Sequence, residues 1–307
     1  MGKAMFFLFL LPLSWLPLGL LYRIAYLIYF LLYRILGYRK DVVIKNINTS
    51  FPKLDQKAKK QVIKDYYKHF ADILVEGIKN LSISEASLKK RYKIRNPELV
   101  NTYFEEGQSI ILCAGHINNW EWWITFQNTA LKHQAIGIGM PLTQASLGAE
   151  INNKRARLGM IVTDSKNYKT EIGKPENNPF ALLILGDQSP GSVKKSYWTH
   201  FLNQTTAFTF GTEMIANSYN LPVIYYTVQK VKRGYYELEF KLLCAEPLSL
   251  QYGEITEKYV HFLEKDILNE PSQWIWSHKR WKKSVPKTLN SIKNEHKKHF
   301  NARFRNI

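Results

Sequence analysis

Residues 109–123, SIILCAGHINNWEWW, decide how the rest of the chain is organised. An apolar run from Ile110 to Ala114 ends at Gly115-His116, and two asparagines then lead into an aromatic segment that carries Glu121. This order predicts a buried strand, a turn and the start of a helix. A histidine at the open end of a strand can act as a general base when an acceptor hydroxyl reaches it and a carboxylate fixes its tautomer.

Both residues of this H-x4-E pattern also have a purely structural interpretation. Glu121 stands where a capping box with Asn118 as N-cap would place its acid. His116 can equally be a hydrogen-bonded histidine at a strand end. Capping accounts for the acid but gives no reason for the histidine, so the sequence context favours a chemical role for His116.

The composition indicates a globular protein with an anionic partner. The chain has 307 residues, 45% of them hydrophobic, which is enough for one large α/β domain or two smaller ones. Its formal net charge of +18 predicts contact with nucleic acid, a phospholipid leaflet or an acidic carrier protein. The two cysteines, Cys113 and Cys244, lie in apolar runs, so we expect buried thiols and no disulfide framework.

The N-terminal segment predicts a membrane anchor. No charged residue occurs from Ala4 to Tyr22, a length sufficient for a bilayer core of roughly 30 Å, although Pro12 and Pro17 would kink a helix. A cleaved signal peptide is disfavoured because no small-x-small cleavage site is well placed. Basic residues after the anchor place the body in the cytoplasm. We therefore expect an anchor over residues 1–36, an α/β domain over 37–285 and a basic tail, helical or loose, over 286–307.

Short apolar runs alternate with helical patterns after residue 109. This alternation predicts an α/β fold, with a mixed, largely parallel sheet flanked by helices and closed by an antiparallel hairpin. The expected strands cover residues 109–114, 135–140, 160–163, 181–186, 223–231 and 235–244. The expected helices cover residues 55–79, 120–132, 145–158, 209–219 and 256–268.

Other familiar catalytic signatures are missing from the sequence. There is no G-x-S-x-G elbow, no H-E-x-x-H motif, no Walker loop and no G-x-G-x-x-G. The remaining histidines do not fall at metal-ligand spacing. We therefore expect no metal and no bound cofactor.

Six features in register resemble the late lauroyl and myristoyl acyltransferases of lipid A biosynthesis, within the lysophospholipid acyltransferase superfamily. They are the apolar N-terminus, NINTSFP at residues 46–52, the His116-x4-Glu121 motif, Arg155-x3-Gly159, Gly186-Asp187-Gln188, and PSQWIWSHKRWK at residues 271–282. The resemblance implies transfer of a fatty acyl group from acyl carrier protein or coenzyme A to a hydroxyl of a glycolipid. It also implies a bacterial inner membrane location, with phospholipid as a further partner and the catalytic domain on the cytoplasmic side.

The resemblance also implies roles for individual residues. His116 would be the general base, and Glu121 would hold its other ring nitrogen. Arg155 would bind substrate phosphate or the oxyanion, unless it simply belongs to an exposed basic helix. Asp187 and Gln188 should lie at the same sheet edge as His116, as substrate-binding or as structural residues.

The remaining candidates are basic and aromatic. Lys194 is a candidate for phosphopantetheine or an acidic carrier, or is a solvated loop lysine. Arg280 is a candidate head-group contact, whereas we expect Trp274 and Trp276 to pack in the core. The tryptophans of residues 120–123 either line an acyl groove or are plain core, the more frequent role.

Three functions remain open. The first is O-acyl transfer to a lipid A precursor. The second is the same chemistry on another bacterial lipid, such as an aminolipid or a phosphoinositide mannoside. The third is a catalytically silent basic protein of the membrane surface, whereas nucleic-acid binding is disfavoured because the anchor is present and no binding module is recognisable.

Overall fold

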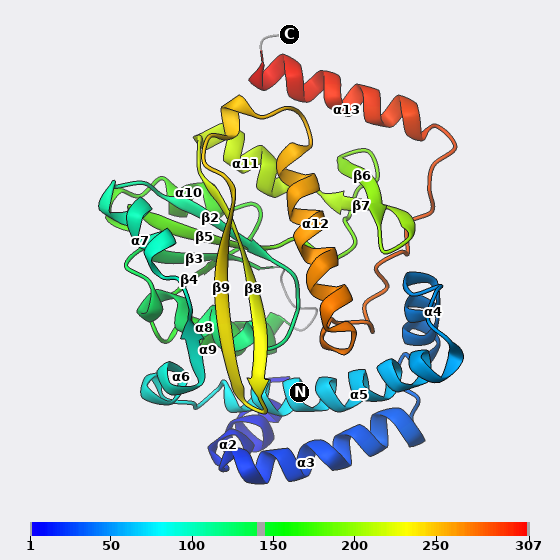
Figure 1. Cartoon of the computed structure of the whole chain (residues 1–307). Helices are drawn as coiled ribbons and strands as arrows, with labels where there is room; N and C mark the ends of the chain where they lie inside the picture. The colour runs from blue at the N-terminus through cyan, green and yellow to red at the C-terminus, as the bar shows by residue number, and fades with distance from the viewer. Residues whose placement is uncertain (1, 140–144, 306–307) are drawn as a thin grey trace.

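The computed structural model describes residues 2–139 and 145–305. Its centre is a seven-stranded sheet of order β1-β9-β8-β2-β5-β3-β4, surrounded by helices (Figure 1). The strands are β1 (Tyr92–Ile94), β2 (Ile110–Ala114), β3 (Gln134–Ile138), β4 (Ile161–Thr163), β5 (Phe180–Leu185), β6 (Ser196–Phe201), β7 (Gln204–Thr209), β8 (Val223–Lys232) and β9 (Tyr235–Cys244). The main helices are α3 (Leu18–Phe30), α4 (Lys40–Ser50), α5 (Gln56–Lys79), α8 (Trp120–Ala130), α9 (Ala145–Ala156), α11 (Gly211–Tyr219), α12 (Glu254–Asn269) and α13 (Leu289–Phe304). The shorter ones are α1 (Gly2–Met5), α2 (Leu11–Trp15), α6 (Glu85–Arg91), α7 (Glu98–Glu105) and α10 (Tyr168–Ile172).

The expected α/β class is confirmed. All pairs in the large sheet are parallel except β8 with β9, which form the antiparallel hairpin. Strand β2 is central and buried at every position, as its uninterrupted apolar sequence requires. The six expected strands are present with ends shifted by one or two residues, and Met140, the expected end of one, lies outside the described residues.

Several elements were not expected from the sequence. Helix α4 buries Val43 and Ile47, which are spaced one helical turn apart. The separate hairpin β6–β7 turns at Leu202 and Asn203, both with positive φ. Strand β1 adds a parallel edge to β9. None of these elements changes the central strands that carry residues 109–123.

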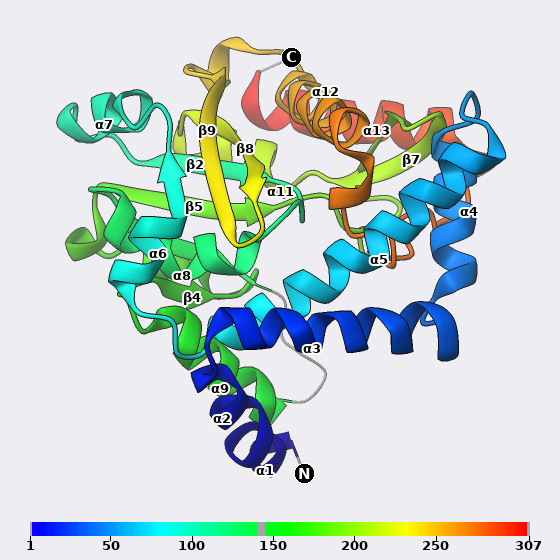
Figure 2. The same ribbon diagram turned by 60° about the horizontal axis from the view of Figure 1, so that its bottom comes forward.

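The N-terminal segment differs from the expected single span. The chain leaves helical geometry at Leu16, before Pro17, so residues 4–22 do not form one helix. The longest apolar helical stretch instead runs from Leu18 to Ile35, long and apolar enough to cross a membrane by length and composition. Helix α3 lies alongside α5 and buries Leu18, Leu21 and Ala25 (Figure 2). This packing ties the apolar segment to the body of the protein.

The basic C-terminal segment forms a helix. Phe300 of α13 is buried in a small aromatic cluster with Tyr197 and Phe210. The rest of α13 is largely exposed and runs along one edge of the molecule (Figure 1). Of the two alternatives for this segment, the structure shows the appended helix.

Candidate active site

His116 lies directly beyond the buried strand β2, after Gly115. A Cβ atom on Gly115 would lie 2.4 Å from Leu263 Cδ1 and 3.2 Å from Asp187 Oδ2. A side chain at this position would therefore push aside the tip of the Leu263 side chain and crowd the acid beside His116. Glycine is favoured here because both side chains approach the backbone closely.

Asp187, beyond the end of β5, is the acid that contacts His116. Strands β2 and β5 pair in parallel up to Ala114 and Leu185, so the two chains leave the sheet side by side. Asp187 Oδ1 lies 2.5 Å from His116 Nδ1. Its Oδ2 accepts the backbone N–H of His116 at 2.8 Å and the indole N–H of Trp274 at 2.7 Å. The carboxylate is 1% exposed and is fully engaged by these donors.

The electrostatics favour an ionised acid beside the imidazole. Burial alone would lower the pKa of His116, but the charge and hydrogen bond of Asp187 outweigh burial and raise it. Burial alone would likewise raise the pKa of Asp187, yet His116 and the other donors hold it at about 2. Asp187 therefore stays ionised at neutral pH. It fixes the neutral tautomer with the proton on Nδ1 and the lone pair on Nε2.

The free ring nitrogen of His116 faces the accessible side of the site. The His116 side chain is 15% exposed, and the amide nitrogen of Gln188 lies 3.3 Å from Nε2. Trp120 packs against the imidazole at a ring distance of 5.1 Å. Because Nε2 is an acceptor in this tautomer, the Gln188 amide marks where a substrate hydroxyl could donate its proton.

The expected contact between Glu121 and the imidazole is replaced by a different pair. Glu121, whose side chain is 21% exposed, accepts two hydrogen bonds from Arg155, at 2.9 Å from Nε and 2.5 Å from Nη2. Arg155 also donates to Asn152 at 3.1 Å. Burial would lower the pKa of Arg155, but Glu121 raises it. Arg155 therefore stays protonated near His116, with Glu121 as its counter-charge. Its neighbour Arg157 donates to the carbonyls of Lys154 and Ile83.

The start of α8 also differs from the expected capping box. Asn119 is the N-cap, and its side-chain oxygen accepts the N–H of Trp122 at 2.9 Å. Asn118 instead adopts a positive φ of 55° and donates to Val228 O and Gln273 Oε1, both at 2.6 Å. The two asparagines thus have separate tasks. One begins the helix, and the other fixes the motif to strand β8 and to the turn Pro271–Gln273.

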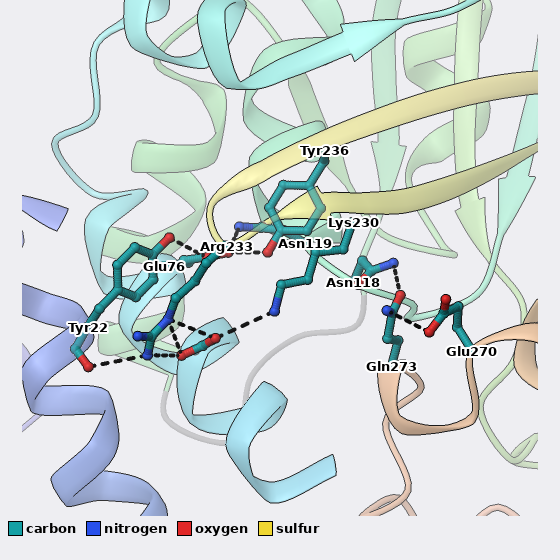
Figure 3. A network of polar contacts seen from close by, with 10 residues as sticks. Tyr22, Glu76, Asn118, Asn119, Lys230, Arg233, Tyr236, Glu270 and Gln273 are labelled. Atoms are coloured by element: carbon teal, nitrogen blue, oxygen red, sulfur yellow. Dashed lines mark hydrogen bonds and ion pairs between the residues drawn. The ribbon is translucent and has the colours of Figure 1, made fainter. Parts of the chain in front are cut away.

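Glu76 of α5 is a residue that the sequence did not single out. It is fully buried and accepts from Asn119 at 2.6 Å, Tyr236 at 2.6 Å and Tyr22 at 2.7 Å (Figure 3). Tyr22 belongs to α3, so one carboxylate joins the apolar helix to the cap of the active-site helix. The available signal was an acid three residues after Ile73, inside the apolar stripe of α5.

The other predicted residues lie in different surroundings. Arg280 is 1% exposed and stacks on Phe208 at 4.1 Å, so the structure does not place it at a lipid head group. Its burial lowers its pKa to about 10. Lys194 is exposed on the loop before β6.

The tryptophans are mostly core residues. Trp274 and Trp276 are buried and pack edge to face, as expected. Trp122 and Trp123 are also buried in the main core, which favours the plain core role over an acyl groove. Only Trp120 of this group touches the imidazole.

The sequence matches the family profile for bacterial lipid A biosynthesis acyltransferases over residues 3–283. The chain belongs to this family. It is therefore an acyltransferase, and its apolar N-terminal helix together with the family indicates association with a membrane. No curated protein sequence matches the chain. The His116–Asp187 pair of this acyltransferase combines a histidine with a buried carboxylate that holds one of its ring nitrogens.

Proposed function

We propose that this acyltransferase moves a fatty acyl group from an acyl carrier protein or coenzyme A thioester to a hydroxyl of a lipid A precursor. The observation that carries the proposal is His116, with Nδ1 on the buried Asp187 and Nε2 on the accessible side. A base held in one tautomer needs neither a metal nor a covalent intermediate to activate a hydroxyl toward a thioester.

The proposed reaction uses one base for both proton transfers. His116 Nε2 takes the proton of the acceptor hydroxyl while the hydroxyl oxygen attacks the thioester carbonyl carbon. The carbon–sulfur bond then breaks, and the imidazolium returns the proton to the departing thiolate. Asp187 stabilises the imidazolium between the two steps, because its carboxylate remains ionised beside Nδ1.

The other predicted site residues have positioning or binding roles in this proposal. Glu121 holds Arg155 in a fixed orientation beside the imidazole, where the guanidinium contributes positive charge to the site. Gln188 yields its place at Nε2 to the acceptor hydroxyl. Lys194 is exposed and available to an acidic carrier protein or to phosphopantetheine.

The N-terminal helices rest on the membrane surface in this proposal and do not cross it. Lys79 of α5 donates to the carbonyls of Ser14 and Leu16, and Tyr22 donates to the buried Glu76. A spanning α3 would have to break these bonds or draw the lysine-rich α5 into hydrocarbon. The exposed apolar side chains of this segment suit an interfacial anchor: Phe7, Leu8, Phe9, Trp15, Leu20, Leu27, Phe30, Ile35 and Leu36. We place it on the cytoplasmic side of the inner membrane.

Mass spectrometry tests the proposed reaction directly. The full-length chain is incubated in detergent micelles with a lipid A precursor and either acyl carrier protein or coenzyme A thioester. We expect one added acyl group on the precursor, and lipids from a deletion strain should lack the same group. Unchanged lipid A together with an altered aminolipid in that strain would replace this acceptor by the other lipid class.

A further inference from the structure

A pocket of about 310 Å³, lined by charged and aromatic side chains, lies where the apolar helix α3 meets α5 and the β8–β9 hairpin. Helix α3 contributes three lining residues, α5 four and the β8–β9 hairpin two, and the turn Pro271–Gln273 supplies another wall. The lining side chains with polar groups are Tyr26 and Tyr29 of α3, Asp65, Lys68, His69 and Asp72 of α5, and Lys230 and Arg233 of the hairpin. The pocket is separate from His116 and takes no part in the proton transfers proposed above.

His69 is the feature that points to a ligand. It is 7% exposed and lines the pocket, yet neither of its ring nitrogens has a hydrogen-bond partner among the described residues. Burial and the charge of Lys230 lower its pKa to about 3, so the ring is neutral and offers one donor and one acceptor. A buried polar group without a partner is costly, and a ligand in the pocket would remove that cost.

The cations of the pocket are held in place before any ligand binds. Arg233 donates to Asp72 through Nε, at 3.0 and 3.1 Å, and through Nη2, and its guanidinium lies 4.2 Å from the Tyr22 ring centre and 4.7 Å from that of Tyr26. Lys230 contacts Asp72 at 3.5 Å, a loose ion pair (Figure 3). These groups need little reordering to receive an anion.

The mixture of charges in the pocket suits a phosphorylated sugar. The carboxylates of Asp65 and Asp72 stand beside the cations of Lys68, Lys230 and Arg233. Phosphate oxygens accept from ammonium and guanidinium groups, whereas sugar hydroxyls donate to carboxylates and imidazole nitrogens. The same acids pair with these cations, Lys68 with Asp65 at 3.3 Å and Lys230 with Asp72 at 3.5 Å. The lining therefore presents cations, carboxylates and the ring nitrogens of His69 side by side.

The pocket also stands at the right place for an acceptor. Gln273 lines it and accepts the amide of Asn118, two residues after His116, at 2.6 Å. The next residue, Trp274, donates to Asp187. Two hydrogen bonds, through Gln273 and Trp274, therefore connect the wall of the pocket with Asn118 and with Asp187. The opposite wall belongs to α3, so acyl chains of a bound lipid can leave along the apolar helix.

We propose that this pocket binds the phosphorylated sugar head group of the acceptor lipid, with Lys230 and Arg233 on the phosphate and His69 on the sugar. The inference rests on the proposed function for the identity of the acceptor. It adds a binding site for the head group, whose wall is joined to the His116 motif by the Asn118–Gln273 hydrogen bond.

A binding titration tests the pocket without requiring catalysis. Glucosamine 1-phosphate is titrated into the full-length chain in detergent micelles by calorimetry, with the variants Lys230→Gln and His69→Phe. We expect about tenfold or greater loss of affinity in each, because each loses a buried polar contact to the ligand. The matched control is Lys232→Gln, an exposed lysine on the same hairpin outside the pocket lining, expected to stay within about twofold of the wild type. Thermal melting checks that each variant is folded.

Three results would overturn the pocket proposal. They are no binding by the wild type, equal binding by the pocket variants, and equal competition by phosphatidylglycerol vesicles, which would make it a general phospholipid head-group site. Kinetics add a second readout: Lys230→Gln should raise the KM for the lipid acceptor while the KM for the thioester is unchanged. If the wild type transfers no acyl group to a lipid A precursor, the proposed function fails, and the titration still decides the pocket.

Discussion

Two pairs of an acid and a base flank the start of α8, and they form for different reasons. His116 and Asp187 are 71 residues apart and meet because β2 and β5 are neighbours in the sheet. Glu121 and Arg155 are 34 residues apart and join two helices beside the sheet. The first acid is almost completely buried, whereas the second pair is partly open to solvent.

The two pairs therefore differ in what they hold in place. Asp187 orients the imidazole of His116, whereas Glu121 and Arg155 hold the helices beside it. A buried carboxylate with three donors can set the tautomer and the pKa of one imidazole. A bidentate pair at the surface of two helices mainly fixes those helices relative to each other. Proximity in the sequence points to Glu121 as the partner of His116, but sheet pairing selects Asp187.

Removing His116, the proposed base, should have the largest effect. His116→Ala should lower acyl transfer by ~10²–10⁴-fold, the range expected for a lost general base. The variant should still fold and remain in the membrane fraction, because Asp187 keeps the hydrogen bonds from the backbone N–H of residue 116 and from Trp274. Radiolabelled acyl transfer by purified protein measures the effect. Retained activity would remove His116 from the base role.

Replacing the buried acid should have the next largest effect. Asp187→Asn keeps the shape of the side chain but loses the charge that fixes the proton on Nδ1, so we expect a loss of about 10²-fold in kcat. The matched control is Asp41→Asn, an exposed aspartate on α4, which should behave like the wild type. A kcat near that of the wild type in Asp187→Asn would show that the imidazole needs no charged partner.

Much of the fold could be predicted from the sequence. The strand ends near His116 and Asp187 follow from uninterrupted apolar runs with clear breaks. The β8–β9 hairpin follows from two runs rich in β-branched and aromatic residues on either side of Gly234. The β6–β7 hairpin was missed because its turn at Leu202 and Asn203 lacks a glycine, the usual signal of positive φ. The sequence predicts only a kink at Pro17 within one span, since residue patterns do not show that α3 packs against α5.

The candidate site was predicted only in outline. The sequence placed His116 and Asp187 at one sheet edge, because both follow apolar runs. It did not reveal that β2 and β5 are adjacent, and this adjacency decides which acid contacts the imidazole. Glu76 was missed for the same reason, since its partners come from α3, from α8 and from β9.

The pH dependence of the reaction tests the effect of Asp187 on the pKa of His116. The base must be neutral, and Asp187 raises the pKa of His116 above its ordinary value of 6.5. We therefore expect kcat/KM of the wild type to fall as the pH drops through a midpoint above 6.5. In Asp187→Asn the midpoint should move to lower pH, because the charge that favours the imidazolium is gone. An unchanged midpoint would show that another group controls the acidic limb.

Breaking the helix pair should have a smaller effect on chemistry and a clear effect on stability. Glu121→Gln leaves the Arg155 guanidinium without its counter-charge, so we expect a loss of about 1–3 kcal/mol in the free energy of unfolding and about tenfold in activity. The double variant Glu121→Gln with Arg155→Met should recover part of the stability, because no uncompensated cation remains. A loss in kcat as large as that of Asp187→Asn would instead assign Glu121 to the imidazole during turnover.

Shortening the same side chain should have the smallest effect. Glu121→Asp keeps the charge but withdraws the carboxylate by one methylene, so one of the two hydrogen bonds to Arg155 should be lost. We expect about 0.5–1.5 kcal/mol less stability and activity within about threefold of the wild type, since a typical hydrogen bond contributes this much. Denaturant unfolding and initial rates measure both quantities. A carboxylate that held His116 directly would no longer reach the imidazole in this variant. A fall in kcat well beyond about threefold would therefore assign Glu121 to the imidazole.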